Sequence, residues 1–153
     1  MSSDRWPAPA PPRRLIVAEP PAAYLIRPPL VVDCSLIAAL LFQEPERDEA
    51  QARLFGRSLH APALIDFEIV SVAVKKLKRG ESAVVAEGIA RLDVFPIERH
   101  EVDPAETLKL AMKYQITGYD AAYLWLAAEL RAPLATFDRQ LATAAQAHLS
   151  ALR

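Results

Sequence analysis

Cysteine is almost absent from this chain, since Cys34 is the only one among its 153 residues. A single cysteine cannot form an intrachain disulfide, so an apolar core must hold the fold, and a reducing intracellular compartment is expected. Long apolar runs are also lacking, because no stretch approaches the roughly 20 apolar residues that span a membrane. The short apolar run after Arg14 ends at Glu19, before a signal sequence is complete. These absences predict a cytoplasmic protein.

Net charge is nearly absent as well. Eighteen lysines and arginines stand against nineteen aspartates and glutamates, which leaves a net charge of -1. Without an overall positive field, nucleic acid can be bound only by a local basic patch. The motifs G-x-x-x-x-G-K-[ST] and G-x-S-x-G do not occur, which argues against P-loop enzymes and α/β-hydrolases. Apolar residues make up 52% of the chain, enough for the core of one globular domain.

Proline is concentrated at one end of the chain. Eight of the thirteen prolines lie within residues 1–29. Proline has no backbone N–H and a fixed φ angle, so this composition opposes both a helix and a central strand. We therefore expect a Pro-rich N-terminal arm over residues 1–29 and a folded domain over residues 30–153.

Strand-like and helix-like segments alternate from Leu30 onward. The β-branched run at residues 30–32 is typical of a buried parallel strand, and further strands are predicted at residues 93–98 and 133–137. Helices are predicted at residues 35–44, 46–58, 61–80, 81–91, 104–115, 120–130 and from 139 to the end. This alternation predicts an α/β sandwich with a mostly parallel sheet, in which sites form beyond the carboxyl ends of the strands.

Four acids stand where predicted elements begin or end. Asp33 follows the first strand, and Glu68 lies early in the apolar helix at residues 61–80. Asp120 opens the most apolar helix, and Asp138 follows the last strand. Each acid could instead have a purely structural role, as a helix cap, as a loop residue or as a negative charge that the helix dipole stabilises. Carboxylates are seldom buried without a partner, however, and the segments LVVDCS and DAAYLWLAAE contain no basic residue.

A divalent cation would balance these acids. Mg²⁺ and Mn²⁺ prefer hard oxygen ligands, whereas zinc prefers histidine or cysteine. The three histidines, His60, His100 and His148, show no spacing typical of metal ligands, and we expect surface or packing roles for them. Cys34 is expected to be a small packed residue without a catalytic role.

Four motifs carry a resemblance to a known family. They are LVVDCS at residues 30–35, Phe67–Glu68 within APALIDFE, YDAAYLWLAA at residues 119–128 and ATFDRQL at residues 135–141. In this order the motifs resemble the four acidic motifs of PIN-domain ribonucleases, especially the VapC-like toxins of bacterial toxin–antitoxin pairs. The resemblance covers about residues 30–148 and implies a PIN-like α/β/α sandwich.

The resemblance also implies a chemistry. The implied catalytic and metal-binding residues are Asp33, Glu68, Asp120 and Asp138. Together they would hold Mg²⁺ or Mn²⁺ for the cleavage of single-stranded RNA, with Ser35 and Thr136 as supporting hydroxyls. A small antitoxin protein and a homodimer are implied as partners. Two features depart from the family pattern, because Ser71 stands where an asparagine is common and residues 1–29 have no counterpart.

Basic and aromatic residues provide candidate RNA contacts. Lys75 and Arg79 fall on the same helical face as Glu68, at offsets of seven and eleven residues. Their alternative role is to complement the dipole at the end of the helix. Tyr123 and Trp125 are expected to pack in the core rather than to stack on bases, because the helix around them is apolar.

Other functions fit the sequence less well. A phosphoaspartate phosphatase of the haloacid-dehalogenase type would have a second Asp two residues after Asp33, where this chain has Ser35. A receiver domain would have a lysine after a late strand, but the last lysine is Lys113. A catalytically weak PIN-fold module for RNA binding or scaffolding would lack an acid, whereas all four are present. We therefore favour a metal-dependent endoribonuclease that is the toxin of a toxin–antitoxin pair.

Overall fold

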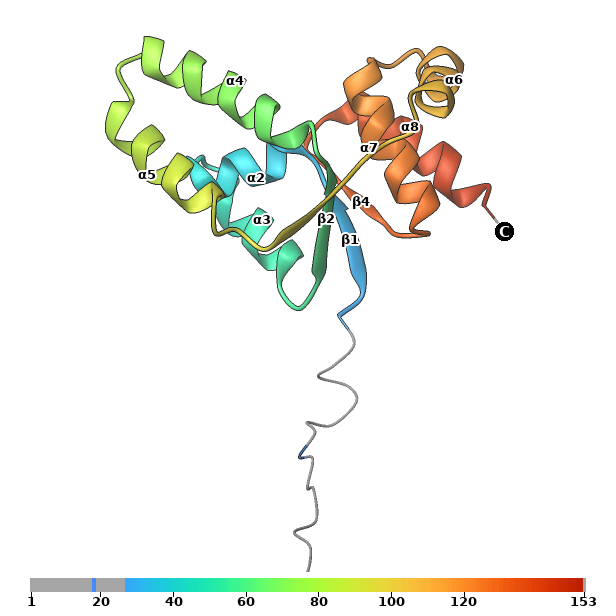
Figure 1. Ribbon diagram of the computed structural model, residues 1–153, viewed down its shortest axis with the longest axis horizontal. Helices are drawn as coiled ribbons and strands as arrows, with labels where there is room; N and C mark the ends of the chain where they lie inside the picture. Colours follow the sequence, from blue (N-terminus) through green and yellow to red (C-terminus); the bar gives the residue numbers. More distant parts are fainter. Residues whose placement is uncertain (1–17, 19–26, 153) are drawn as a thin grey trace, which may run out of the picture.

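The computed structural model describes Ala18 and residues 27–152. The expected N-terminal arm over residues 1–29 therefore lies almost entirely outside the described residues. Within them, helices flank a four-stranded sheet on both sides, with α2 to α5 on the left and α6 to α8 on the right in Figure 1. None of the helices in this part of the chain is both long and apolar enough to cross a membrane.

The sheet has the order β3-β2-β1-β4, and each pair of neighbouring strands is parallel. The strands are β1 (Pro29–Val32), β2 (Ser58–Pro62), β3 (Ile97–His100) and β4 (Leu134–Ala135). The helices are α2 (Cys34–Leu41), α3 (Arg47–Leu54), α4 (Ile65–Lys78), α5 (Ser82–Leu92), α6 (Pro104–Tyr114), α7 (Gly118–Glu129) and α8 (Arg139–Ser150). The predicted α/β class with a mostly parallel sheet is confirmed.

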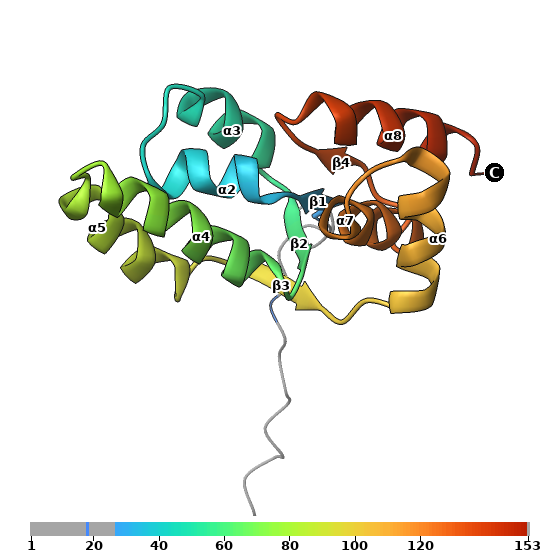
Figure 2. The same cartoon turned by 90° about the horizontal axis from the view of Figure 1, so that it is seen from above.

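The centre of the core is formed by β1 and α7. Val31 and Val32 are fully buried, and α7 packs against both β1 and β2. The helices on the other side of the strands, α2 to α5, cover the rest of the sheet, as the view from above shows (Figure 2). Because the strands are parallel, their carboxyl ends lie at one edge, and the helices that follow them begin there. This edge is where the acids of the sequence motifs are placed.

Two predicted elements are wrong in their bounds. Residues 58–62 form β2, although no strand was predicted there and the two predicted helices end at Ser58 and begin at Ala61. Pairing with β1 on one side and β3 on the other determines this conformation, and such pairing overrides a weak local pattern. Strand β3 also lies later than predicted, because Pro96 has no N–H for the ladder and the strand begins at Ile97.

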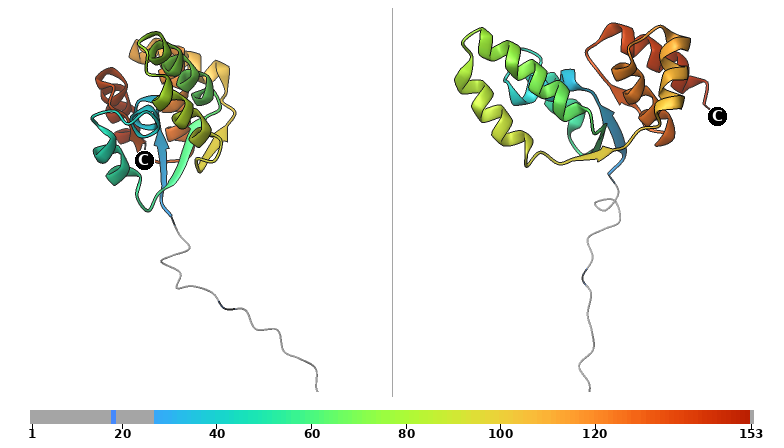
Figure 3. Two further views of the ribbon diagram at one scale, coloured as in Figure 1. Left: turned by 90° about the vertical axis from the view of Figure 1, so that its left-hand side faces the viewer. Right: turned by 45° about the horizontal axis from the view of Figure 1, so that its top comes forward.

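Helix α4 is less buried than its composition indicates. Its buried residues are Ile65, Ile69 and Ala73. Its exposed apolar residues are Phe67, Val70, Val74 and Leu77. Figure 3 shows α4 extending away from the strands, with α5 beside it. We call these four exposed residues the α4 apolar stripe. They form an apolar surface on α4 that faces solvent in the single chain.

Candidate metal and catalytic site

Asp33 is the most buried member of the candidate site, with only 6% of its surface exposed. It follows β1 and caps α2, since the backbone N–H of Leu36 donates to its Oδ1 at 3.3 Å. The Ser35 hydroxyl donates to the same oxygen at 2.6 Å, and the Thr136 hydroxyl donates to Oδ2. Burial raises the pKa of Asp33, and these hydrogen bonds oppose that rise. The carboxylate is therefore fixed in orientation.

The same two hydroxyls connect Asp33 to the segment between β4 and α8. Thr136 Oγ1 accepts a hydrogen bond from the backbone N–H of Asp138 at 2.9 Å. Ser35 Oγ accepts one from the backbone N–H of Phe137 at 3.0 Å. Each hydroxyl thus donates to Asp33 and accepts from the β4–α8 connection. Both predicted supporting residues contact Asp33, and they place Asp138 beside it.

Asp138 caps α8 and also acts electrostatically on the site. The backbone N–H of Leu141 donates to Asp138 Oδ1 at 2.7 Å, which is the geometry of a helix N-cap. The charge of Asp138 also raises the pKa of Asp120, so the two carboxylates lie close together. A carboxylate has two oxygens, and only Oδ1 is used by the cap. The structural and the functional alternatives for Asp138 are therefore compatible.

Asp120 lies in the first turn of α7. Thr117 caps this helix, because its hydroxyl oxygen accepts a hydrogen bond from the backbone N–H of Asp120 at 3.1 Å. Burial raises the pKa of the Asp120 carboxyl, and the charges of Asp138 and Asp33 raise it further. The side chain of Asp120 consequently belongs to the same acidic cluster as its two neighbours, although it comes from a different element.

Glu68 completes the cluster from α4. Burial raises the pKa of Glu68, as do the charges of Asp120 and Asp33, whereas a hydrogen bond from Tyr123 lowers it. The Tyr123 hydroxyl donates to Glu68 Oε1 at 2.7 Å. Ser71 takes no part in this contact, because its hydroxyl donates to the backbone carbonyl of Phe67 at 3.1 Å.

Tyr123 is the functional candidate that the sequence analysis did not identify. Its side chain is buried, as predicted, and so it is not accessible for base stacking. The buried hydroxyl needs a hydrogen-bond partner, and Glu68 provides it across 55 residues of sequence. A tyrosine inside an apolar helix was the available signal, but the sequence did not identify the partner.

The four acids are suited to a hard divalent cation. In the described residues, no three of these acids have carboxylate oxygens within 4.8 Å of one another, so an ion would be held by one or two of them together with water. Mg²⁺ retains several waters and binds proteins through one or two carboxylates. A set of donors made only of carboxylate oxygens suits Mg²⁺ or Mn²⁺ better than zinc. The side chains of the cluster therefore fit the predicted ions.

The two predicted RNA contacts differ in their distance from the acids. Lys75 and Arg79 are both exposed. The charge of Lys75 lowers the pKa of Cys34, which is next to Asp33. Arg79 follows Glu68 by eleven residues, a rise of about 16 Å along the helix axis. Lys75 is therefore the nearer of the two to the acids, whereas Arg79 is the C-cap residue of α4.

Cys34 and Trp125 have the packing roles predicted for them. Both are partly buried against the hydrophobic core. Burial raises the pKa of the Cys34 thiol to about 12, and the charges of Glu68 and Asp33 add to the rise. A thiol with this pKa is protonated at neutral pH and is a poor nucleophile. The candidate site thus offers carboxylates but no reactive thiolate.

Two of the three histidines, His60 and His100, lie together, which the sequence analysis did not predict. Nδ1 of His60 and Nε2 of His100 lie 2.9 Å apart, and Glu98 is close to both rings. Strand pairing between β2 and β3 brings these residues together, although they are 40 residues apart in sequence. His148 packs as expected, with its Nδ1 hydrogen-bonded to the hydroxyl of Tyr114 at 3.0 Å.

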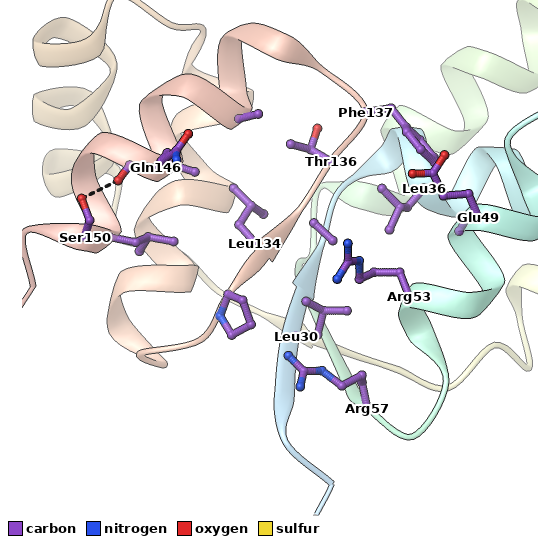
Figure 4. Close-up of a pocket in the computed structure, with 16 residues that line it drawn as sticks. Leu30, Leu36, Glu49, Arg53, Arg57, Leu134, Thr136, Phe137, Gln146 and Ser150 are labelled. Carbon is purple, nitrogen blue, oxygen red and sulfur yellow. Dashed lines mark hydrogen bonds between the residues drawn. The ribbon is translucent and has the colours of Figure 1, made fainter.

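A separate pocket of about 690 Å³ lies between α3 and α8, along β1 and β4 (Figure 4). Its lining includes Leu30 and Leu134, and Figure 4 shows Arg53 and Arg57 extending toward β1. Thr136 also lines the pocket, but none of the four acids does. The pocket is therefore distinct from the acidic cluster.

The chain is similar to several known proteins. A family model described as PIN domain matches residues 30–147. Ribonuclease VapC3 of Pyrobaculum aerophilum is 32% identical over 120 residues, covering 74% of this chain and 92% of that protein. Ribonuclease VapC12 of Mycobacterium tuberculosis is 30% identical over 118 residues, covering 74% of this chain and 89% of that protein. A crystal structure of a Pyrobaculum aerophilum protein, at 20% identity, matches the fold with a TM-score of 0.55 over 83% of this chain and 98% of that chain.

Asp138→Ala should lower the free energy of unfolding by about 0.5–2 kcal/mol, because the hydrogen bond to the backbone N–H of Leu141 is lost. Asp138→Asn is the matched control, since the amide oxygen can still cap α8. Urea denaturation in the presence of EDTA measures both variants. An equal loss of stability in the two would contradict the capping role.

Asp120→Asn tests the repulsion among the acids. The folded-state pKa of Asp120 is raised, so its contribution to stability is complete below the unfolded pKa and is lost as pH rises through the folded pKa. At pH 7 without metal, the ionised carboxyl therefore destabilises the fold. We expect the variant to have a higher melting temperature than the wild type in EDTA at pH 7, and this gain should vanish at acidic pH.

In excess Mn²⁺ we expect the wild type to have a higher melting temperature than Asp120→Asn. The intact cluster of the wild type binds the ion more tightly than that of the variant, and binding stabilises the folded state. Differential scanning fluorimetry across pH, with EDTA or with Mn²⁺, gives both results. Identical responses of the two proteins to Mn²⁺ would show that Asp120 is not part of a metal site.

Proposed function

The chain belongs to the PIN domain family, and from this premise we propose that it is a metal-dependent endoribonuclease that cleaves single-stranded RNA. The observation that carries the proposal is a cluster of acids from separate elements, in which Ser35 and Thr136 hold Asp33 and Tyr123 holds Glu68 by hydrogen bonds. The pKa of Glu68 is raised by Asp120 and Asp33, and the pKa of Asp120 is raised by Asp138 and Asp33. The names of the two curated relatives, both ribonucleases, support the same reaction class.

Each acid has a distinct position in the proposed site. Asp33 presents a carboxylate held by two hydroxyls, so it is the best oriented ligand. Glu68 is oriented by Tyr123, and Asp138 by its capping hydrogen bond. Asp120 interacts electrostatically with all three other acids, since Asp138 and Asp33 raise its pKa and its own charge raises that of Glu68. When bound, Mg²⁺ or Mn²⁺ stabilises negative charge on a phosphate and lowers the pKa of a bound water.

The RNA is proposed to lie beside α4. The net charge of the protein is -1, so attraction of a polyanion depends on local cations. Lys75 is the nearer of the two exposed cations to the acids, and Arg79 extends the same helical face away from them. A strand that follows this face would place one phosphate near the acids and later phosphates near the end of the helix. A duplex has paired bases and a rigid backbone, so it would follow the helical face less easily than a single strand does. We therefore propose single-stranded RNA as the substrate.

We also propose that the protein is the toxin of a toxin–antitoxin pair in the cytoplasm and that it forms a homodimer. The VapC names of the curated relatives support this role. The α4 apolar stripe supports the presence of a protein partner, because its four residues are between 44% and 77% exposed in the single chain. A small antitoxin that covers α4 would also cover Lys75 and restrict access to Glu68.

Asp33→Asn and Asp120→Asn should each lower the rate of RNA cleavage by at least about a hundredfold, because each removes charge from the ion site with little change in volume. Glu101→Gln is the matched control, since this exposed acid lies outside the cluster. Cleavage of a fluorescent single-stranded RNA by purified protein, with Mn²⁺ or with excess EDTA, measures the effect.

Full cleavage in EDTA would disprove metal dependence. Binding of RNA without cleavage by the wild type would instead favour a catalytically weak RNA-binding module. Near-wild-type cleavage by either Asn variant would remove that residue from the proposed site.

Tyr123→Phe should shift the acid limb of the pH–rate profile to higher pH. The hydrogen bond from Tyr123 lowers the pKa of Glu68, so its loss raises that pKa and keeps Glu68 protonated over a wider range. Tyr114→Phe is the control, because it also loses one hydroxyl hydrogen bond but lies away from Glu68. An unchanged acid limb in Tyr123→Phe would mean that ionisation of Glu68 does not limit the reaction.

A further inference from the structure

A second group of metal-binding side chains lies on strands β2 and β3, separate from the acidic cluster. His60 comes from β2, and Glu98 and His100 come from β3. The parallel register pairs His60 with Glu98 and Pro62 with His100. Side chains on a strand alternate between faces, so all three ligands project from the same face of the sheet. In the part of the chain that the structure describes, this is the only such group with ligand atoms within 4.8 Å of one another.

The distances in this group are close to those of a tetrahedral metal site. Nδ1 of His60 lies 2.9 Å from Nε2 of His100. Oxygens of Glu98 lie 3.6 Å from the first nitrogen and 3.8 Å from the second. Bonds of about 2.0–2.1 Å in tetrahedral geometry separate ligand atoms by about 3.3 Å. Small side-chain rotations therefore convert the observed arrangement into a set of three ligands.

A neighbouring hydroxyl orients the more buried histidine. Ser58 Oγ lies 3.0 Å from His60 Nε2. When that nitrogen donates its proton to Ser58, Nδ1 keeps a lone pair and points it toward His100 and Glu98. Ligating histidines commonly donate their second ring N–H to a partner of this kind. Burial also lowers the pKa of His60, which favours the neutral ring.

Strand register places the Glu98 side chain opposite His60 and on the same face as His100. Its carboxylate is 66% exposed and lies within 4 Å of both rings, so it can complete a ligand set with them. Two imidazole nitrogens and one carboxylate are a common zinc-binding set, with a fourth position left for water. Such nitrogen-rich sites bind Zn²⁺, Ni²⁺ or Cu²⁺ much better than Mg²⁺.

We propose that His60, Glu98 and His100 bind one transition-metal ion of the Zn²⁺ class and that this ion fastens strand β3 to β2. Strand β3 is at the edge of the sheet and has only four residues, so it gains most from such a link. Arg99, between two of the ligands, forms a two-bond ion pair with Asp66 at the start of α4. The ion therefore strengthens the strand against which α4 is anchored. This site does not depend on the proposed ribonuclease activity.

Isothermal titration of the tag-free, full-length protein with Zn²⁺, in excess Mg²⁺, tests the proposal. We expect one Zn²⁺ per chain, and we expect the affinity to fall at least tenfold in His100→Gln and in Glu98→Gln. Glu98 is largely exposed, so its variant should fold normally even if a histidine variant does not. Co²⁺ bound at the site should give the visible absorption of a tetrahedral complex, and Zn²⁺ should raise the melting temperature of the wild type.

His148→Gln is the matched control, because it also removes a hydrogen-bonded imidazole but outside the group. Asp120→Asn separates this site from the acidic cluster. Unchanged Zn²⁺ affinity in both controls would support the proposal. Absence of saturable Zn²⁺ binding, full affinity in Glu98→Gln and His100→Gln, or loss of binding in Asp120→Asn would each overturn it.

Discussion

The buried carboxylate of Asp33 constrains the structure around the candidate site. Ser35 and Thr136 donate hydrogen bonds to its two oxygens, and both hydroxyls accept backbone N–H groups from the connection between β4 and α8. A buried charge is costly without such partners, so the ends of β1 and β4 cannot separate freely. The position of Asp138 depends on this arrangement, and through it the charge environment of Asp120 does too.

The acids raise the energy of the folded chain in the absence of a cation. Burial and mutual repulsion raise the pKa values of Glu68 and Asp120, and burial raises that of Asp33. Functional sites commonly accept a loss of stability of this kind. The surrounding residues limit the loss, because Tyr123, Ser35 and Thr136 supply hydrogen bonds to the charged forms. The same hydrogen bonds that limit the loss of stability also orient the carboxylates.

The two candidate metal sites differ in the chemistry of their donors. The acidic cluster provides only carboxylate oxygens, which suit a hard ion that keeps part of its hydration. His60 and His100 provide nitrogens within hydrogen-bond distance of each other, which suits a borderline ion held by direct bonds. The two groups of side chains therefore favour different kinds of ion. Their positions also differ, because one lies beyond the strand ends and the other lies on an edge strand.

Much of the acidic site could be predicted because its residues stand at local boundaries. Asp33 follows a compact apolar strand, and Asp138 precedes a helix. Each acid can therefore be identified from the few residues around it. The parallel strands then bring these boundaries to the same edge, which is a general property of the fold class. The α/β class and the four acids were accessible from the sequence for this reason.

The tertiary structure alone decided the contacts between distant segments. The hydrogen bond from Tyr123 to Glu68 spans 55 residues, and that between His60 and His100 spans 40. Local propensity contains no information about register, and β2 was not predicted because its pairing with β1 and β3 overrides its local pattern. The sequence by itself determined the order of elements and the acids that end them. Only strand pairing and helix packing decided which side chains meet, because those contacts depend on where whole elements lie in space.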